Sequence, residues 1–312
     1  MAQENMNLFT LFERFSDEES AREWFENVTW PSGERFCPRC GGDNTKSVPR
    51  GKPMPYFCND CRQYFSVKTG TVMAESNLSL RQWATAIYLM VSHPKGLSSL
   101  QMSRHLGITQ KTAWMMMQKI RESWNFENGQ LPTEEQLDGD VEVDETYIGG
   151  KEKNKHSRKK LRAGSGTVGK IPVIGAIERD GGRVFAKPIP GTDTTQLTGF
   201  VEQNILYGAN VFTDEHSGYK LQPLYYTHES VSHGKGEYVR DRAHTNSIES
   251  FWAVMKRGYI GTYHWWSEKH LHRYVNEFCG RFNLRHLEVS KRMEDIVRGF
   301  RGKSLTYKKL TQ

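Results

Sequence analysis

Val141-Glu-Val-Asp-Glu-Thr-Tyr-Ile148 begins with an alternation of apolar and polar residues, which is the period of a half-buried β-strand. A second strand is predicted over Ile171-Pro-Val-Ile-Gly-Ala-Ile177 and a third over Arg183-Val-Phe-Ala-Lys-Pro-Ile189. Asp180-Gly-Gly182 lies between these two strands and predicts a hairpin turn. The three segments therefore predict the first strands of a sheet.

The sequence after this hairpin mixes helical and strand periods. A helix is predicted over residues 194–206, short strands over 210–214 and 227–231, and helices from Thr245 onward. Three strands, a helix, two strands and a helix follow the element order of a ribonuclease-H-like α/β domain, although other α/β folds share parts of that order. We predict a domain of this type over residues 139–290.

Three carboxylates stand out by position, although each of them alone is most simply a surface acid. Asp144 is at the middle of the first strand, Asp214 at the end of a later strand and Glu249 near the start of a helix. A buried Asp144 is costly unless it is paired or binds a cation. Such acids can converge, and their hard oxygens suit Mg²⁺ or Mn²⁺. Two ions about 3.5 to 4 Å apart can activate an attacking oxygen and stabilise the leaving oxygen of a phosphodiester.

Polar neighbours surround this predicted site. Because strand side chains alternate, Glu145 should point away from Asp144, whereas Glu142 and Thr146 share its face. Glu142 is therefore either an additional acid near the site or a solvated residue at the strand end. His244 is either at the rim of the site or a helix-start residue with local hydrogen bonds.

Two pairs of cysteines, Cys37-Pro-Arg-Cys40 and Cys58-Asn-Asp-Cys61, stand seventeen residues apart. Two residues between cysteines let both thiolates of a pair face one ion, and two pairs supply the four ligands of tetrahedral Zn²⁺. The segment between the pairs can hardly build an apolar core, so the metal should supply much of its folding energy. Two disulfides or a redox pair are the alternative. We predict a structural zinc ribbon over residues 31–70.

Residues 79–124 carry apolar residues at helical spacing. Ser98 is predicted to cap a second helix, Gly107 to form a turn and Thr109 to cap a third helix. This pattern is typical of a helix-turn-helix, and the second helix of such a unit enters the major groove of DNA with its N-terminal residues. Those residues are here Thr109, Gln110, Lys111 and Thr112. A three-helix packing element with no role in DNA binding is the alternative.

Shorter segments flank the predicted domains. Residues 1–30 are predicted to be helical, with a capping box of Ser16 and Glu19. Residues 125–137 are predicted to be a polar linker, and residues 291–312 a basic C-terminal tail. No stretch approaches the roughly 20 apolar residues that a membrane helix needs, and the N-terminus has no signal-peptide pattern. We therefore expect a soluble, cytoplasmic protein with no membrane partner.

One loop of this basic chain is especially rich in positive charge. The formal net charge is +7 and the pI is about 9.0, which favours a polyanionic partner. Residues 151–162 hold seven Lys or Arg against one Glu. A charge run is usually a solvated loop. This run follows the strand that carries Asp144, so contact with phosphates is the other interpretation, with Lys159 and Lys160 as candidate residues.

Three stretches carry a family resemblance: Val141-Glu-Val-Asp-Glu-Thr-Tyr-Ile-Gly-Gly150, Val211-Phe-Thr-Asp-Glu-His-Ser-Gly-Tyr219 and His244-Thr-Asn-Ser-Ile-Glu-Ser-Phe-Trp-Ala-Val-Met-Lys256. Together they resemble the DDE transposases of bacterial insertion sequences, in particular the ISXO type with an N-terminal zinc ribbon. The thirty-four residues between Asp214 and Glu249 are close to the separation typical of that superfamily. The resemblance covers essentially the whole chain.

The resemblance implies roles for particular residues. Asp144, Asp214 and Glu249 would hold Mg²⁺ or Mn²⁺, the catalytic cofactor. Lys256, seven residues after Glu249, matches a basic residue that such enzymes use near the scissile phosphate. Some relatives have Asn in place of the third acid, which leaves Asn246 as the alternative to Glu249.

The activity that the resemblance implies is DNA transposition. The protein would bind terminal inverted repeats of double-stranded DNA and cleave the transposon ends without a covalent enzyme intermediate. It would then join the 3′-hydroxyls to target DNA. Such enzymes work as multimers, so we expect a homodimer or higher oligomer on DNA, near the nucleoid of a bacterial host. The alternatives are a non-catalytic DNA-binding regulator on a decayed catalytic domain, and a repair nuclease of the same fold.

Overall fold

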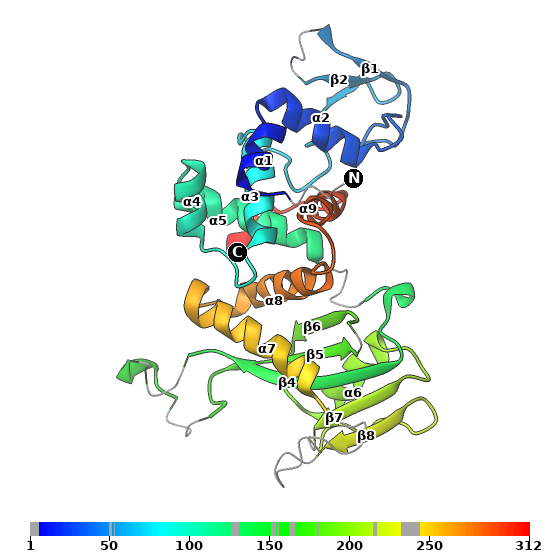
Figure 1. Cartoon of the computed structure of the whole chain (residues 1–312), viewed down its shortest axis with the longest axis vertical. Coiled ribbons are helices and arrows are strands. Elements are labelled where there is room, and N and C mark those ends of the chain that lie inside the picture. Colours follow the sequence, from blue (N-terminus) through cyan, green and yellow to red (C-terminus); the bar gives the residue numbers. More distant parts are fainter. Residues whose placement is uncertain are drawn as a thin grey trace. The chain divides into compact units, whose positions relative to one another are not determined.

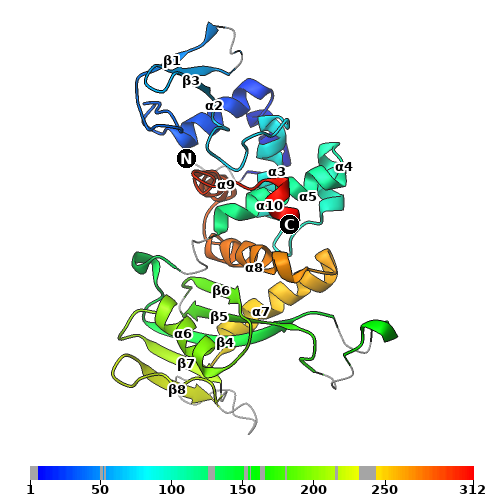
Figure 2. The ribbon, with the colours of Figure 1, turned by 180° about the vertical axis from the view of Figure 1, so that it is seen from behind.

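The computed structural model describes residues 6–49, 52, 54–125, 131–150, 154, 156–161, 166–179, 181–214, 217–231 and 244–312. The chain forms two compact units, Met1–Trp124 with His286–Gln312, and Asn125–Arg285. Figure 1 shows the ribbon and Figure 2 the same ribbon from behind. Within the described ranges, no helix has both the length and the apolar character needed to cross a bilayer.

The first unit contains a small antiparallel sheet and a group of helices. The sheet has the order β1-β2-β3. The elements of this unit are α1 (Leu8–Arg14), α2 (Glu18–Thr29), β1 (Thr45–Ser47), β2 (Tyr56–Cys58), β3 (Gln63–Phe65), α3 (Leu80–Ser92), α4 (Ser99–Leu106), α5 (Gln110–Arg121), the 3-10 turn η2 (Glu122–Trp124), α9 (Val289–Arg298) and α10 (Tyr307–Thr311).

Aromatic residues before and within the predicted zinc ribbon build part of the apolar core. Trp30, directly after α2, lies 6.0 Å from Tyr56 and 6.3 Å from Phe65, measured between ring centroids. All three side chains are buried in the core of the first unit. The segment between the cysteine pairs was expected to lack apolar core residues, but Tyr56 of that segment is one. Part of the ribbon's folding energy therefore comes from packing.

The helix boundaries in the first unit follow local capping residues. The Ser98 hydroxyl accepts the N–H of Gln101 at 3.2 Å, and the Thr109 hydroxyl accepts the N–H of Thr112 at 3.2 Å. Gly107, between these helices, has the left-handed φ of 63° that a glycine adopts without strain. The predicted caps of α4 and α5 and the turn between them are thus confirmed.

The first predicted capping box was wrong by one residue. Asp17, and not Ser16, is the N-cap of α2, and its carboxylate accepts the N–H of Ser20 at 2.8 Å. The two residues compete because both can cap a helix. The expected single helical segment is also divided into α1 and α2 at this point.

The C-terminal residues are part of the first unit's core, where a basic tail was expected. α9 buries Met293, Ile296 and Val297, and Phe300 after it packs on Trp83 with 6.1 Å between ring centroids. The apolar residues recur at helical spacing between basic ones, as in an amphipathic helix. The overall charge of the segment made this helix hard to recognise from composition. α10 lies beside α5 (Figure 2), and Lys111 of α5 is 4.4 Å from the ring centroid of Tyr307.

The second unit is a mixed five-stranded sheet covered by helices. The strand order is β6-β5-β4-β7-β8. β5 is antiparallel to β4 and β6, whereas β7 is parallel to β4 and β8. The elements are η4 (Thr133–Glu135), β4 (Asp140–Ile148), η6 (Ser157–Lys159), β5 (Ile171–Glu178), β6 (Val184–Pro188), α6 (Thr194–Asn204), β7 (Asn210–Asp214), β8 (Thr227–Val231), α7 (Asn246–Gly258), the π-helix η8 (Tyr259–Tyr263) and α8 (Glu268–Asn283).

This architecture is consistent with the predicted ribonuclease-H-like domain. The five predicted strands and the helices over α6 and α7 are confirmed. Asp180, in the predicted hairpin turn, lies outside the described residues, but β5 and β6 pair antiparallel as expected. The helix-turn-helix identity of α4 and α5, and the predicted domain limits, stay predictions.

Residues of the central strand β4 alternate between two apolar layers. Val141 and Val143 share a buried cluster with Leu197 of α6. On the other face, α7 packs across β4 and β5, and Ile148 is buried with residues of α7 and α8. Asp144 shares this second face by alternation, and its carboxylate accepts a hydrogen bond from Trp252 of α7.

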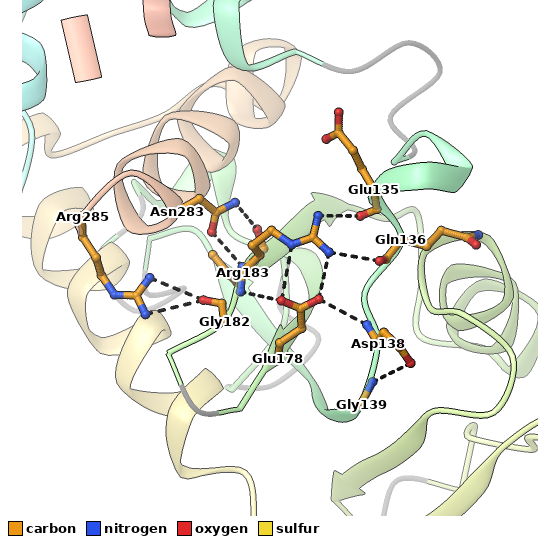
Figure 3. A network of polar contacts seen from close by, with 10 residues as sticks. Glu135, Gln136, Asp138, Gly139, Glu178, Gly182, Arg183, Asn283 and Arg285 are labelled. Atoms are coloured by element: carbon orange, nitrogen blue, oxygen red, sulfur yellow. Dashed lines mark hydrogen bonds and ion pairs between the residues drawn. The ribbon is translucent and has the colours of Figure 1, made fainter. Parts of the chain in front are cut away.

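A polar network holds the β5–β6 hairpin against the segment that leads into β4 (Figure 3). Glu178, the last residue of β5, pairs with Arg183 at 2.9 Å and accepts the N–H of Asp138 at 3.2 Å. The Arg183 guanidinium donates to the carbonyl oxygens of Glu135 and Gln136, each at 3.1 Å. These bonds fix the position at which β4 begins.

Candidate active site and metal centre

The four predicted zinc ligands lie together in the ribbon. Their sulfur atoms are all within 4.8 Å of one another. The separation is 3.7 Å between Cys37 and Cys61 and 3.6 Å between Cys40 and Cys58. Tetrahedral Zn–S bonds of about 2.3 Å would place the sulfurs about 3.8 Å apart, so this arrangement fits one zinc ion.

The chemistry of the cysteine cluster points to a structural role. All four are free thiols rather than disulfide partners. The pKa of Cys61 is raised to about 12, mainly by burial and to a smaller extent by hydrogen bonds with Cys40, Cys37 and Cys58. Cys61 therefore stays a thiol unless a cation stabilises its thiolate form. Four sulfur ligands leave no open position for a substrate.

The three predicted catalytic acids come from three elements of the second unit. Asp144 lies in the middle of β4, Asp214 is the last residue of β7 and Glu249 lies in the first turn of α7. Because β4 and β7 are parallel neighbours, Asp144 and Asp214 lie toward the same ends of adjacent strands. α7 brings Glu249 over the face of β4 that carries Asp144.

The electrostatics of Asp144 reflect its neighbours. Burial raises the pKa of Asp144 to about 7, together with the negative charges of Glu145, Asp214 and Glu249. A carboxyl group whose pKa is raised by folding destabilises the fold as the pH rises from about 4 toward 7. A bound cation would favour the anionic form and remove that penalty. The structure thus places Asp214 and Glu249 within electrostatic reach of Asp144.

The three carboxylates are not gathered as tightly as the cysteines. Among groups of three or more His, Cys, Asp or Glu side chains in the described part of the chain, only the four cysteines bring all their ligand atoms within 4.8 Å of one another. Glu249 is exposed, and its Oε1 accepts a hydrogen bond from the Thr245 hydroxyl at 3.1 Å. The donor set is nevertheless the hard oxygen set that Mg²⁺ and Mn²⁺ prefer.

Trp252 and Gly175 fix the orientation of Asp144. The indole Nε1 of Trp252, on α7, donates to Oδ2 of Asp144 at 3.1 Å. Gly175 is the β5 partner of Asp144, and a Cβ atom there would lie 2.6 Å from the Trp252 ring. The missing side chain at residue 175 therefore makes room for the indole that holds Asp144. Sequence reasoning missed both residues, although a glycine inside an apolar strand signals close approach.

The neighbours of Asp144 on β4 have two different roles. Glu145 points to the opposite face, as predicted, where its carboxylate accepts the Tyr219 hydroxyl at 2.7 Å. Glu142 shares the face of Asp144, as predicted, but it is neither solvated nor open to a cation. It is fully buried and hydrogen-bonded to protein groups.

The other predicted catalytic residues lie along α7. Asn246 is its first residue and is exposed. Burial lowers the pKa of Lys256, and the negative charge of Asp144 acts in the opposite direction. Lys256 is therefore within electrostatic reach of Asp144. His244 lies just before the helix, with Nδ1 at 3.0 Å from Glu142 Oε1 but not aligned for a hydrogen bond.

The predicted DNA-contacting residues lie in both units. Gln110 and Lys111 are exposed at the start of α5. Thr112 is partly buried and lies 2.8 Å from Thr109, hydroxyl to hydroxyl. In the second unit Lys160 is exposed, whereas the side chain of Lys159 and most of the basic loop lie outside the described residues.

Comparison with known proteins supports the family resemblance. Residues 16–64 match the transposase zinc-ribbon domain, and residues 136–283 match the ISXO2-like transposase domain. A protein in the transposable element ISH50 of Halobacterium salinarum is 26% identical over 277 residues, which cover 85% of this chain and 90% of that protein. Taken together, these matches assign residues 136–283 to the ISXO2-like transposase domain, behind a transposase zinc ribbon.

Proposed function

We propose that this protein is a DNA transposase that binds terminal inverted repeats, cleaves the transposon ends and joins the freed 3′-hydroxyls to target DNA. DNA transposition is the family-level activity of its transposase domain. The observation that carries the proposal is the placement of Asp144, Asp214 and Glu249 on β4, β7 and α7. There, burial and then the charges of Glu145, Asp214 and Glu249 raise the pKa of Asp144.

Each acid has its own part in the proposed reaction. Asp144, Asp214 and Glu249 would hold two divalent cations, Mg²⁺ or Mn²⁺. When bound, such cations activate the attacking oxygen and stabilise the leaving oxygen of a phosphodiester. Asp144 is the partly buried ligand, held by Trp252. Glu249 is the exposed ligand, and it would exchange its hydrogen bond from Thr245 for a cation.

Lys256 would bind the substrate rather than the cations. It lies seven residues after Glu249 on α7, close enough to Asp144 for their charges to interact. Its ammonium group can contact the phosphate next to the bond that is cut and offset negative charge that develops there. Asn246 lies three residues before Glu249 on the same helix face and is the alternative third ligand.

DNA binding would use surfaces outside the acidic site. The exposed Gln110 and Lys111 at the start of α5, with Thr112, would enter the major groove. Lys159 and Lys160 would contact phosphates beside the catalytic domain. Because two transposon ends must be cut together, we propose a homodimer or higher oligomer on DNA. The protein would act in the cytoplasm beside the nucleoid; the relative in Halobacterium salinarum shows that the resemblance is not restricted to bacteria.

Asp144→Ala and Lys111→Ala should separate catalysis from DNA binding. Asp144→Ala removes a proposed metal ligand and leaves α5 unchanged, so binding to a terminal-repeat duplex should persist while Mg²⁺-dependent cleavage stops. Lys111→Ala should weaken binding and reduce the slope of log affinity against log salt concentration by about one. Gel-shift titrations at several salt concentrations and a cleavage gel measure both effects.

A control lysine sharpens the comparison. Lys291 is an exposed residue of α9 that pairs with Glu294, so Lys291→Ala removes the same charge away from α5. If Lys111→Ala binds no more weakly than Lys291→Ala, residues 98–124 are a packing element. Repeat binding without any cleavage by the wild-type protein would favour a regulator, and cleavage without joining would favour a repair nuclease.

A further inference from the structure

Glu142, two residues before Asp144 on the same face of β4, has no exposed surface. Its Oε2 accepts the backbone N–H groups of Ser247 at 2.8 Å and Ile248 at 3.1 Å, in the first turn of α7. Its Oε1 accepts from Nε of Arg179 at 3.0 Å. Both oxygens are thus engaged by protein donors, which separates Glu142 from the acids that would coordinate cations.

The bonds from Glu142 replace a cap that α7 lacks. The first N–H groups of a helix have no partner within the helix. Thr245, the N-cap residue, makes no capping bond with its side chain, and its hydroxyl donates to Glu249 instead. A negative charge at this end of a helix is further favoured by the helix dipole. Glu142 therefore fastens the N-terminus of α7 to β4.

Arg179 extends this attachment to a third element. Its guanidinium carbon lies 3.8 Å from the ring centroid of Phe212 on β7, and its Nη2 donates to the carbonyl oxygen of His244 at 2.7 Å. Phe212 is the strand partner of Glu142 in the sheet. One buried carboxylate–guanidinium pair therefore touches β4, β7 and the start of α7.

We propose that Glu142, held in place by Arg179, is a positioning residue for the three acids. The inference rests on the proposed function. Asp144 lies two residues after Glu142 on β4, and Asp214 lies two residues after its strand partner Phe212 on β7. Glu249 lies within the turn of α7 that Glu142 holds. Glu142 acts through the helix rather than on the reacting groups, and it sets where Glu249 stands relative to the two aspartates.

Glu142→Gln tests this role with a neutral side chain of the same shape. Its amide offers one oxygen and one nitrogen, so it cannot accept from α7 and from Arg179 at once. We expect the affinity of the full-length protein for Mn²⁺, measured by titration calorimetry, to fall about 10- to 100-fold, as for other groups that orient metal ligands. Cleavage of a terminal-repeat duplex should need correspondingly more Mn²⁺, while repeat binding by the first unit stays unchanged.

Glu178→Gln is the matched control. Glu178 also pairs with an arginine in the second unit, but its contacts are with Arg183 and the segment before β4 (Figure 3). The Mn²⁺ affinity of the Glu178→Gln protein should equal that of the wild type. An equal loss in both variants, or none in Glu142→Gln, would overturn the positioning role. If Glu142→Gln does not unfold cooperatively, Glu142→Asp keeps the charge with a shorter reach and should lower Mn²⁺ affinity; unchanged affinity contradicts the proposal.

The two proposals fail in different ways. A wild-type protein that binds Mn²⁺ but neither cuts nor joins DNA would end the proposed transposase activity, and the Mn²⁺ affinities of the variants would still decide the role of Glu142. A wild-type protein that binds no Mn²⁺ would contradict both.

Discussion

Glu249→Gln is expected to abolish Mg²⁺-dependent cleavage and strand transfer of a terminal-repeat oligonucleotide, while the fold and DNA binding stay intact. The substitution keeps the shape of the side chain and removes the charge that would offset two divalent cations. Losing a residue that merely orients a ligand costs about 10- to 100-fold in metal affinity or activity, so losing the ligand itself should cost more. Because Glu249 is exposed on α7, little stability is at stake.

Asn246→Ala is the comparison that identifies the third ligand. Asn246 lies on the same face of α7 as Glu249, but an amide contributes only a neutral oxygen, so its loss should reduce activity less. The products are compared on a gel in Mg²⁺ and in Mn²⁺. An active Glu249→Gln protein beside an inactive Asn246→Ala protein would reverse the assignment. Full activity in both variants would mean that neither residue is the third ligand.

Cys58→Ser should remove the single zinc equivalent and disorder the cysteine turns of the ribbon. Structural zinc contributes on the order of 10 kcal/mol of apparent binding free energy in small zinc domains, and a hydroxyl cannot replace a thiolate in a four-sulfur site. The buried Trp30, Tyr56 and Phe65 should limit the loss of structure to the cysteine turns. Elemental analysis gives the zinc content, and thermal unfolding should change in the first unit alone.

Cys279→Ser supplies the control for the zinc measurement. Cys279 is a buried cysteine of α8 in the second unit, so its substitution should leave the zinc equivalent in place. Zinc retained in Cys58→Ser, or absent from the wild-type protein, would refute the four-cysteine assignment.

Much of the fold could be predicted because its signals are local. The alternation of Val141–Ile148 predicted β4, and Ser98, Gly107 and Thr109 predicted the ends of α4 and α5. A cap or a strand period involves residues that are close in the sequence, so one stretch contains the whole signal. α9 was missed because its three basic residues conceal the apolar stripe when composition is considered over the whole tail.

The candidate site was only partly predictable because its supports are long-range. Asp144, Asp214 and Glu249 could be selected by their places in predicted elements. The buried role of Glu142 depends on N–H groups more than a hundred residues later, and that of Gly175 depends on the ring of Trp252. Strand alternation predicted on which face of the sheet Glu142 lies. It could not predict the hydrogen-bond partners of Glu142, because the packing of α7 on the sheet determines them.

The proposed site is tested most directly by the reaction of the wild-type protein with a labelled terminal-repeat duplex and a target duplex in Mg²⁺, with Asp144→Ala in parallel. We expect cleavage at the repeat end and a longer product in which the new 3′-hydroxyl is joined to target DNA. Both products should be absent with Asp144→Ala and lost on addition of a chelator. Cleavage and joining that continue in Asp144→Ala, or that proceed without a divalent cation, would contradict the proposed site.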